Sequence, residues 1–157
     1  MIHLNLMSVG MVEETGTVII VLRAPDLERL LVMEVGPLEG RAIALEAEGV
    51  RAPRPLTHDL MYDIIRSLGA TVGEVQIRDF RDKVFLASLI LEREGGERFE
   101  LDARPSDAIA VAMRAGAPIY VAEHVMTEAG VDESEAEEMD EDPDDDDPGD
   151  DEGTILH

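Results

Sequence analysis

The sequence predicts a single compact α+β domain with a mixed or antiparallel sheet and three to four helices, followed by a disordered acidic tail. Its length of 157 residues suits one domain with an appendage better than two domains. Strand-like and helix-like segments do not alternate regularly, which favours α+β over a doubly wound fold. Acidic residues crowd into the last part of the chain. We therefore expect a domain at 1–130 and a tail at 131–157.

Seven short segments carry the apolar patterns of β-strands and are separated by turn residues. They are 2–12, 17–24, 29–35, 71–78, 83–92, 97–102 and 118–122. Four segments have helical apolar spacing or an Ala-rich composition, and each is followed by a glycine that suits a helix end. They are 37–48, 57–68, 105–115 and 123–129. The segment 83–92 is apolar on both faces, which predicts a strand in the covered part of the sheet.

Local signals support the first two helices. Pro37 suits a first helical turn, Thr57 is a good N-cap, and Asp59 would lie where the helix dipole favours an anion. Gly40 falls inside the first helix, where it either costs about 1 kcal/mol relative to Ala or marks a close backbone approach. The second helix is expected to bury a stripe made of Leu60, Ile64, Ile65 and Leu68.

The composition indicates an aliphatic core without covalent staples. Apolar residues make up 45% of the chain, aromatic residues only 3%, and cysteine is absent. Disulfides and thiolate metal sites are therefore excluded. The sequence shows no signal-peptide pattern and no apolar run of membrane-spanning length, so the expected location is the cytoplasm.

Charge is unevenly distributed along the chain. The net charge is −23, and fifteen of the 36 acidic residues lie in 132–152, which leaves 1–131 at −8. An acidic domain does not attract nucleic acid through its overall field, although a metal-dependent site itself needs carboxylates. Mutual repulsion predicts disorder in the acidic segment. Its role is either to keep the protein soluble or to mimic nucleic acid in an Arg-containing groove.

Chemically capable residues gather at the starts of three expected helices. Helix N-termini expose backbone N–H groups and favour anions, so convergence of these junctions would form a pocket of carboxylates, an imidazole and a guanidinium. The residues are Glu39 at the first start, Thr57, His58 and Asp59 at the second, and Asp102, Arg104, Ser106 and Asp107 at the third.

Each of these residues also has a purely structural interpretation. Thr57 and Ser106 suit helix caps, first-turn aspartates complement the helix dipole, Arg104 suits a structural ion pair, and His58 suits an exposed helix position. The sequence contains no H-E-x-x-H pattern and no glycine-rich phosphate loop. Its five aromatic residues also argue against an RNA-stacking surface.

The same junctions resemble the bifunctional nuclease (BFN) domain family. Three segments occur in that family's order and spacing, although Leu38 stands where Phe is common. They are 35–45 (VGPLEGRAIAL), 54–60 (RPLTHDL) and 101–121 (LDARPSDAIAVAMRAGAPIYV). The resemblance implies a small α+β domain that forms homo-oligomers and degrades DNA and RNA.

Two functional hypotheses follow. In a metal-assisted phosphodiesterase, His58 would act as general base or acid, Arg104 would stabilise phosphate charge, and Asp107 would complete the catalytic set. Mg²⁺ or Mn²⁺ would be held by Glu39, Asp59 and Asp102, with Asp107 as a further candidate ligand. In a non-catalytic homo-oligomeric assembly or regulatory module, the same residues would form ion pairs between subunits and helix caps. The two differ in whether these residues line a cleft or an interface.

Overall fold

One eight-stranded sheet organises the protein, and the computed structural model describes residues 1–140, with side chains described through Glu137. The strand order is β6-β5-β4-β7-β1-β2-β3-β8, and every pairing is antiparallel except that of β4 with β7. The predicted α+β class with a mixed sheet is confirmed. The strands are β1 (Ile2–Val12), β2 (Thr17–Ala24), β3 (Arg29–Val35), β4 (Ala70–Arg81), β5 (Val84–Arg93), β6 (Arg98–Ala103), β7 (Ile119–Val121) and β8 (Val131–Asp132).

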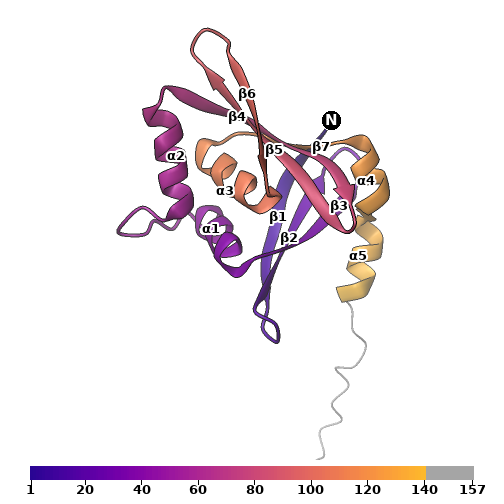
Figure 1. Ribbon diagram of the computed structural model, residues 1–157. Helices are drawn as coiled ribbons and strands as arrows, with labels where there is room; N and C mark the ends of the chain where they lie inside the picture. Colours follow the sequence, from indigo (N-terminus) through magenta and orange to yellow (C-terminus); the bar gives the residue numbers. More distant parts are fainter. Residues whose placement is uncertain (141–157) are drawn as a thin grey trace, which may run out of the picture.

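Five helices accompany the sheet in the described part of the chain. They are α1 (Pro37–Ala47), α2 (Thr57–Ser67), α3 (Pro105–Ala115), α4 (Glu123–Ala129) and α5 (Glu133–Asp140). Figure 1 shows α1, α2 and α3 gathered on one side of the sheet, with α4 and α5 toward the opposite side. Helix α3 contacts α1, α2, β4 and β5, so it occupies the centre of this layer. Within residues 1–140, no helix is long and apolar enough to cross a membrane.

The three-residue strand β7 connects the two halves of the sheet. Ile119 pairs with Val75 of β4 in parallel and with Leu4 of β1 in antiparallel orientation. The carbonyl of Pro118 also accepts a hydrogen bond from the Val75 amide at 2.9 Å. Because proline has no N–H to donate, it suits the boundary at which β7 begins.

The core is aliphatic, as the composition predicts. Its largest fully buried side chains come from both halves of the sheet and from α1, α3 and α4. In β5, the run from Ala87 to Leu91 is buried on both faces, which confirms the predicted covered strand. The fully buried large side chains are Leu4, Ile20, Leu22, Leu31, Ile43, Ile77, Ile109, Met126, Val75, Val111, Val121 and Val125.

The prediction that Leu60, Ile64, Ile65 and Leu68 form the buried stripe of α2 is largely wrong. Leu60, Ile64 and Leu68 are about half exposed or more, whereas His58 is buried. Two other residues of the helix, Met61 and Ile65, pack partly against the core. Compared with the prediction, the helix is therefore rotated about its axis so that His58, Met61 and Ile65 face the core. Its contacts with α3 and β4 determine this orientation.

Ordered structure also extends past the predicted domain boundary at residue 130. Strand β8 pairs with β3, and α5 follows it directly. Arg23 on β2 donates from Nε to Glu133 of α5 at 2.9 Å, so a cation offsets acidic charge where the helix begins. The predicted tail therefore starts with a strand and a helix. Its remainder, 141–157, lies outside the described residues, as does the disorder expected there.

Gly40 marks a close backbone approach, which the sequence left as one of two alternatives. A Cβ atom on Gly40 would lie 2.5 Å from the Val18 side chain of β2. We expect Gly40→Ala to destabilise the protein by about 1–3 kcal/mol through overpacking, although Ala is the better helix former. Urea denaturation measures the change. The penalty should shrink in a Val18→Ala background, and a Gly40→Ala protein more stable than wild type would contradict this packing.

Candidate active site

The starts of α1, α2 and α3 converge on one cleft. Its volume is about 460 Å³, and residues from all three helix starts line it. Pro37 and Pro105 occupy the first positions of α1 and α3, where the missing N–H costs no helical hydrogen bond. The N-terminus of a helix favours negative charge, and three of them line this cleft. The lining residues are Leu38, Glu39, Arg41, Ala42, Pro55, Leu56, Thr57, His58, Arg104 and Asp107.

Arg104 links two carboxylates across this cleft. Its Nη2 donates to Glu39 Oε1 at 2.6 Å, and its Nε donates to Asp107 Oδ2 at 2.8 Å. The Arg104 side chain is 65% exposed, whereas those of Glu39 and Asp107 are 16% and 25% exposed. Among residues 1–140, Nη1 of Arg104 has no hydrogen-bonded protein acceptor. The guanidinium therefore keeps donors directed to solvent and to any ligand in the cleft.

His58 and Asp107 form a hydrogen-bonded pair beside Arg104. His58 Nε2 lies 2.8 Å from Asp107 Oδ1, and the His58 side chain is only 8% exposed. An ionised carboxylate only accepts hydrogen bonds, so the proton of this bond belongs to Nε2. In the neutral ring, Nδ1 is then the basic nitrogen. A carboxylate that orients an imidazole in this way is a recurrent element of general base catalysis.

Both carboxylates remain ionised well into the acid range. Burial acts to raise the pKa of Asp107, but hydrogen bonds from His58 and Arg104 outweigh it, and the pKa lies below its ordinary value. The pKa of Glu39 is lowered mainly by the hydrogen bond from its own backbone amide and then by that from Arg104. At neutral pH the cluster thus contains two carboxylates around one guanidinium.

Asp59 belongs to a second, structural pair. The Arg114 guanidinium, 3% exposed, donates from Nε to Asp59 Oδ1 at 2.6 Å. Its other nitrogens donate to the carbonyls of Ala110 at 2.6 Å and Ala42 at 3.2 Å. Asp59 Oδ2 accepts a hydrogen bond from the Leu56 amide at 2.9 Å, so the backbone N–H at the N-cap of α2 has a partner. Arg114 therefore fastens α1, α2 and α3 to one another.

The structure brings together four of the six predicted site residues. Glu39, His58, Arg104 and Asp107 line one cleft, and Asp59 follows His58 in the first turn of α2. Asp102 does not join them. It is 81% exposed near the end of β6 and pairs with Arg78 of β4 at 2.6 Å. Asp102, near the end of β6, therefore lies outside the cleft, whereas Asp107, in the first turn of α3, lines it.

In the described part of the chain, Glu39, Asp59 and Asp102 do not gather into one preformed group of metal ligands. Within residues 1–137, whose side chains are described, no group of three or more His, Asp or Glu side chains is arranged to hold a cation. The three predicted ligands, Glu39, Asp59 and Asp102, each bind a different arginine instead.

Arg114 is the residue of this region that we did not predict to be functional or structural. Its sequence signal was a single charge in the otherwise apolar, Ala-rich run 108–115, where a buried charge requires a partner. The predicted caps are also corrected. Leu56 and Arg104 occupy the N-cap positions of α2 and α3, so Thr57 and Ser106 lie inside their helices. His58 is buried rather than exposed, because Asp107 provides its partner.

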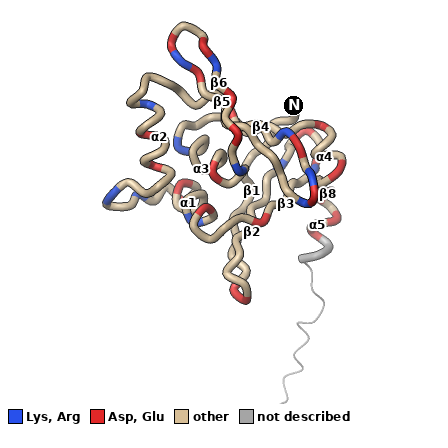
Figure 2. The backbone as a smooth tube through the Cα atoms, in the orientation of Figure 1, with Lys and Arg blue, Asp and Glu red and all other residues tan. Residues whose placement is uncertain are grey.

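Charge over the rest of the domain is mixed. Figure 2 shows Lys and Arg interspersed with Asp and Glu along the described part of the chain. Any anion bound in the cleft would thus be recognised by local donors rather than by a broad positive field.

Asp59→Asn tests the structural pair and the direction of its pKa shift. The Leu56 amide, more than Arg114, lowers the pKa of Asp59 against the opposing effect of burial. The stabilisation is then complete above the unfolded-state pKa of about 4 and is lost as pH falls through the folded-state value. We expect the variant to lose about 1–3 kcal/mol at pH 7. In urea titrations, its difference from wild type should shrink below about pH 4.

Asp63→Asn is the matched control, because Asp63 is an exposed residue of the same helix. Its effect should stay within about 0.5 kcal/mol throughout. A difference between Asp59→Asn and wild type that grows in acid would contradict the lowered pKa.

Comparison with known proteins identifies the family. The bifunctional nuclease domain model matches residues 20–134. An uncharacterised protein of Mycobacterium tuberculosis is 45% identical over 120 residues, covering 74% of this chain and 71% of that protein. Bifunctional nuclease 1 of Oryza sativa subsp. japonica is 30% identical over 116 residues, covering 71% of this chain and 35% of the rice protein. Bifunctional nuclease 2 of the same plant is 28% identical over 137 residues, covering 85% and 42%. This chain therefore spans less than half of either rice protein, and it belongs to the bifunctional nuclease domain family.

Proposed function

We propose that this protein is a nuclease that hydrolyses phosphodiester bonds of DNA, RNA or both in the cleft between α1, α2 and α3. The observation that supports it best is the continuous hydrogen-bonded chain Glu39–Arg104–Asp107–His58 along that cleft. It combines an anion-binding guanidinium with an oriented imidazole, the two functions that phosphodiester hydrolysis needs from side chains. Family membership supports the same reaction class.

Arg104 is proposed to bind the scissile phosphate. Its exposed guanidinium already holds Asp107 and Glu39 through Nε and Nη2, so its position is defined before any ligand arrives. A phosphate oxygen would bind the remaining N–H donors of Nη1 and Nη2. The helix dipoles at the cleft add to this attraction. Charge that develops on the phosphoryl oxygens in the transition state would be stabilised by the same donors.

His58 is proposed as the general base that activates water. Asp107 accepts a hydrogen bond from Nε2–H of His58 and stabilises the imidazolium that forms when Nδ1 takes a proton from the attacking water. The proton is then available for the leaving oxygen. Asp107 remains ionised throughout, because its pKa is low.

A divalent cation is proposed only as a companion of the substrate. Mg²⁺ is commonly held by one or two carboxylates together with substrate phosphates and water. Glu39 and Asp107 are the carboxylates that line this cleft and would contribute here, whereas Asp59 and Asp102 are not among its lining residues. Such a cation would supply Lewis-acid stabilisation of phosphate charge.

The nuclease proposal predicts which substitutions abolish cleavage. His58→Gln, Asp107→Asn and Arg104→Lys should each reduce cleavage of labelled single-stranded DNA, duplex DNA or RNA by about 100-fold or more. Asp102→Asn should stay within a few-fold of wild type, because its carboxylate lies outside the cleft. The assay compares Mg²⁺, Mn²⁺ and chelator, and thermal unfolding verifies that each variant is folded.

The controls separate three outcomes. Equal cleavage by all preparations would identify a contaminating nuclease. Loss of activity in Asp102→Asn alone would place the reaction outside the proposed cleft. Absence of cleavage by every preparation would favour the second candidate function.

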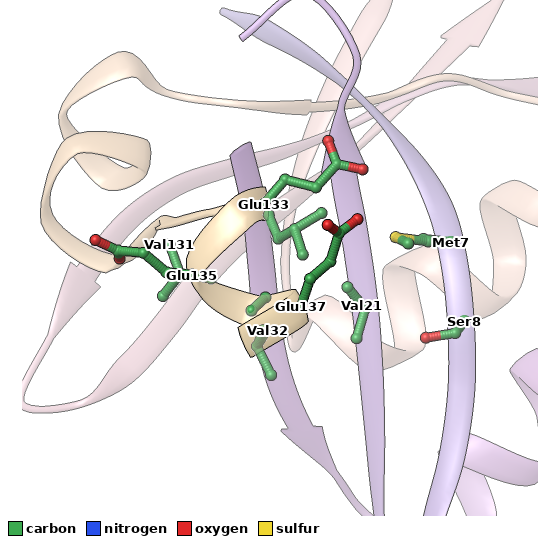
Figure 3. A pocket seen from close by; sticks show the side chains of 10 residues that line it. Met7, Ser8, Val21, Val32, Val131, Glu133, Glu135 and Glu137 are labelled. Carbon is green, nitrogen blue, oxygen red and sulfur yellow. The ribbon is translucent and has the colours of Figure 1, made fainter. Parts of the chain in front are cut away.

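That second candidate is a non-catalytic assembly or regulatory module, and exposed apolar surface favours it. Leu60, Ile64 and Leu68 form an exposed stripe at four-residue spacing on α2. A separate apolar cleft of about 350 Å³ lies between α5 and the strands β1 to β3. Figure 3 shows Val21 and Val32 on those strands, facing α5. Such surfaces commonly mark contacts with other chains.

We further propose that the protein is a homo-oligomer associated through the α2 stripe. Light scattering coupled to size-exclusion chromatography should give a multiple of the monomer mass for the wild type. The double variant Leu60→Gln with Ile64→Gln should move toward the monomer, because it removes the apolar surface that association would bury. Leu27→Gln, which changes an exposed residue in a turn, should not. A monomeric wild-type protein would refute this association.

A further inference from the structure

A second cleft adjoins the candidate active site on the far side of Arg104. Its volume is about 300 Å³, and the end of β3, the start of β5 and the start of α3 line it. Strands β3 and β5 are not neighbours in the sheet order, so the curl of the sheet brings their ends together here. The lining residues are Met33, Glu34, Val35, Gly36, Lys83, Val84, Phe85, Arg104, Pro105 and Ser106.

Lys83, the only lysine of the chain, lies at the rim of this cleft. It occupies the two-residue turn between β4 and β5, where Arg81 pairs with Val84. Asp82 and Lys83 both have positive φ, 51° and 62°. Hairpin turns of this kind favour Asn-Gly, because an L side chain with positive φ is sterically strained. A lysine here is thus unfavourable for the turn itself, and such positions recur at functional sites.

The cleft combines positive charge with apolar surface. Among the lining residues, Lys83 and Arg104 are basic and Glu34 is acidic. Arg104 also binds Glu39 and Asp107, so Lys83 contributes the positive charge that is not already paired within the catalytic cluster. Val84 is 57% exposed, and Phe85 is partly exposed while it packs against Phe80. A nucleotide presents the matching combination, a flat base and an anionic phosphate.

We propose that this cleft is a nucleotide subsite, in which Lys83 binds the phosphate next to the scissile one and Phe85 with Val84 contacts a base. The proposal rests on the nuclease function, because Arg104 belongs to both clefts. It names the substrate class more closely. The protein acts on a chain that continues past the scissile phosphate toward the β4–β5 turn, so it prefers an oligonucleotide to a small phosphodiester.

Binding of a ten-nucleotide, phosphorothioate-linked single-stranded DNA measures the subsite without cleavage. By fluorescence anisotropy at 50 mM salt, Lys83→Gln and Lys83→Gly should each bind about 5–10-fold more weakly than wild type. The slope of log affinity against log salt should fall by about one. Asp82→Gly, the matched control in the same turn, should bind like wild type.

Stability and a small substrate separate binding from folding. Lys83→Gly should unfold at a temperature no lower than wild type, because glycine adopts positive φ without strain. Hydrolysis of bis(4-nitrophenyl) phosphate, which has no second phosphate for Lys83 to bind, should keep its kcat/KM in both Lys83 variants.

Several outcomes would overturn the subsite. If Lys83→Gln bound DNA with unchanged affinity, the proposed subsite would be refuted, while the proposed nuclease function would be unaffected. Parallel loss of small-diester hydrolysis in that variant would make Lys83 structural instead. A wild-type protein that neither binds DNA nor hydrolyses the diester would refute the nuclease function, and the subsite with it.

Discussion

The pairing of β7 with both β1 and β4 is the constraint on which the rest of the structure depends. In the described chain, the three residues of β7 (Ile119–Val121) form the strand whose pairing joins the two antiparallel halves of the sheet. The first half carries α1 and Glu39, and the second carries α2 and α3 with His58 and Asp107. Because α3 leads directly into β7, that pairing also positions α3 against α1. The candidate active site is therefore a product of the joining of the halves, with neither half sufficient alone.

Two arginines of similar chemistry acquire different roles through burial. Arg114 is almost completely enclosed and directs its donors at protein acceptors, so it holds three helices together. Arg104 binds two carboxylates but stays mostly exposed, so part of its guanidinium remains available. A buried guanidinium with satisfied donors has nothing left for a ligand, whereas an exposed one held in place is preorganised to bind an anion. The difference distinguishes the structural pair from the candidate catalytic cluster.

The negative net charge of the domain is consistent with arginines that are surrounded by carboxylates. In the candidate site, carboxylates surround Arg104 and restrict it, and their own acidity is strengthened by the hydrogen bonds they accept. Two acidic residues at the start of the acidic segment are likewise joined to the fold, since Asp132 of β8 pairs with Arg29 and Glu133 of α5 pairs with Arg23. Arginines thus organise an acidic chain locally. This explains how a cleft that is proposed to bind an anion can exist in an acidic domain.

The sequence by itself determined most of the secondary structure, the aliphatic core and the candidate residues at helix starts. Those properties depend on local periodicity, turn residues and composition, which the chain states directly. Tertiary structure decided which face of α2 is buried. The helix cannot bury both Leu60 and His58 against the core, and its contacts with α3 and β4 place His58 on the buried side. Tertiary structure also separated Asp102 from Asp107, and it paired Arg114 with Asp59. Each of these three outcomes depends on contacts between residues that are far apart in sequence. Local sequence patterns do not contain such contacts, which follow from the way the complete sheet is paired and curved.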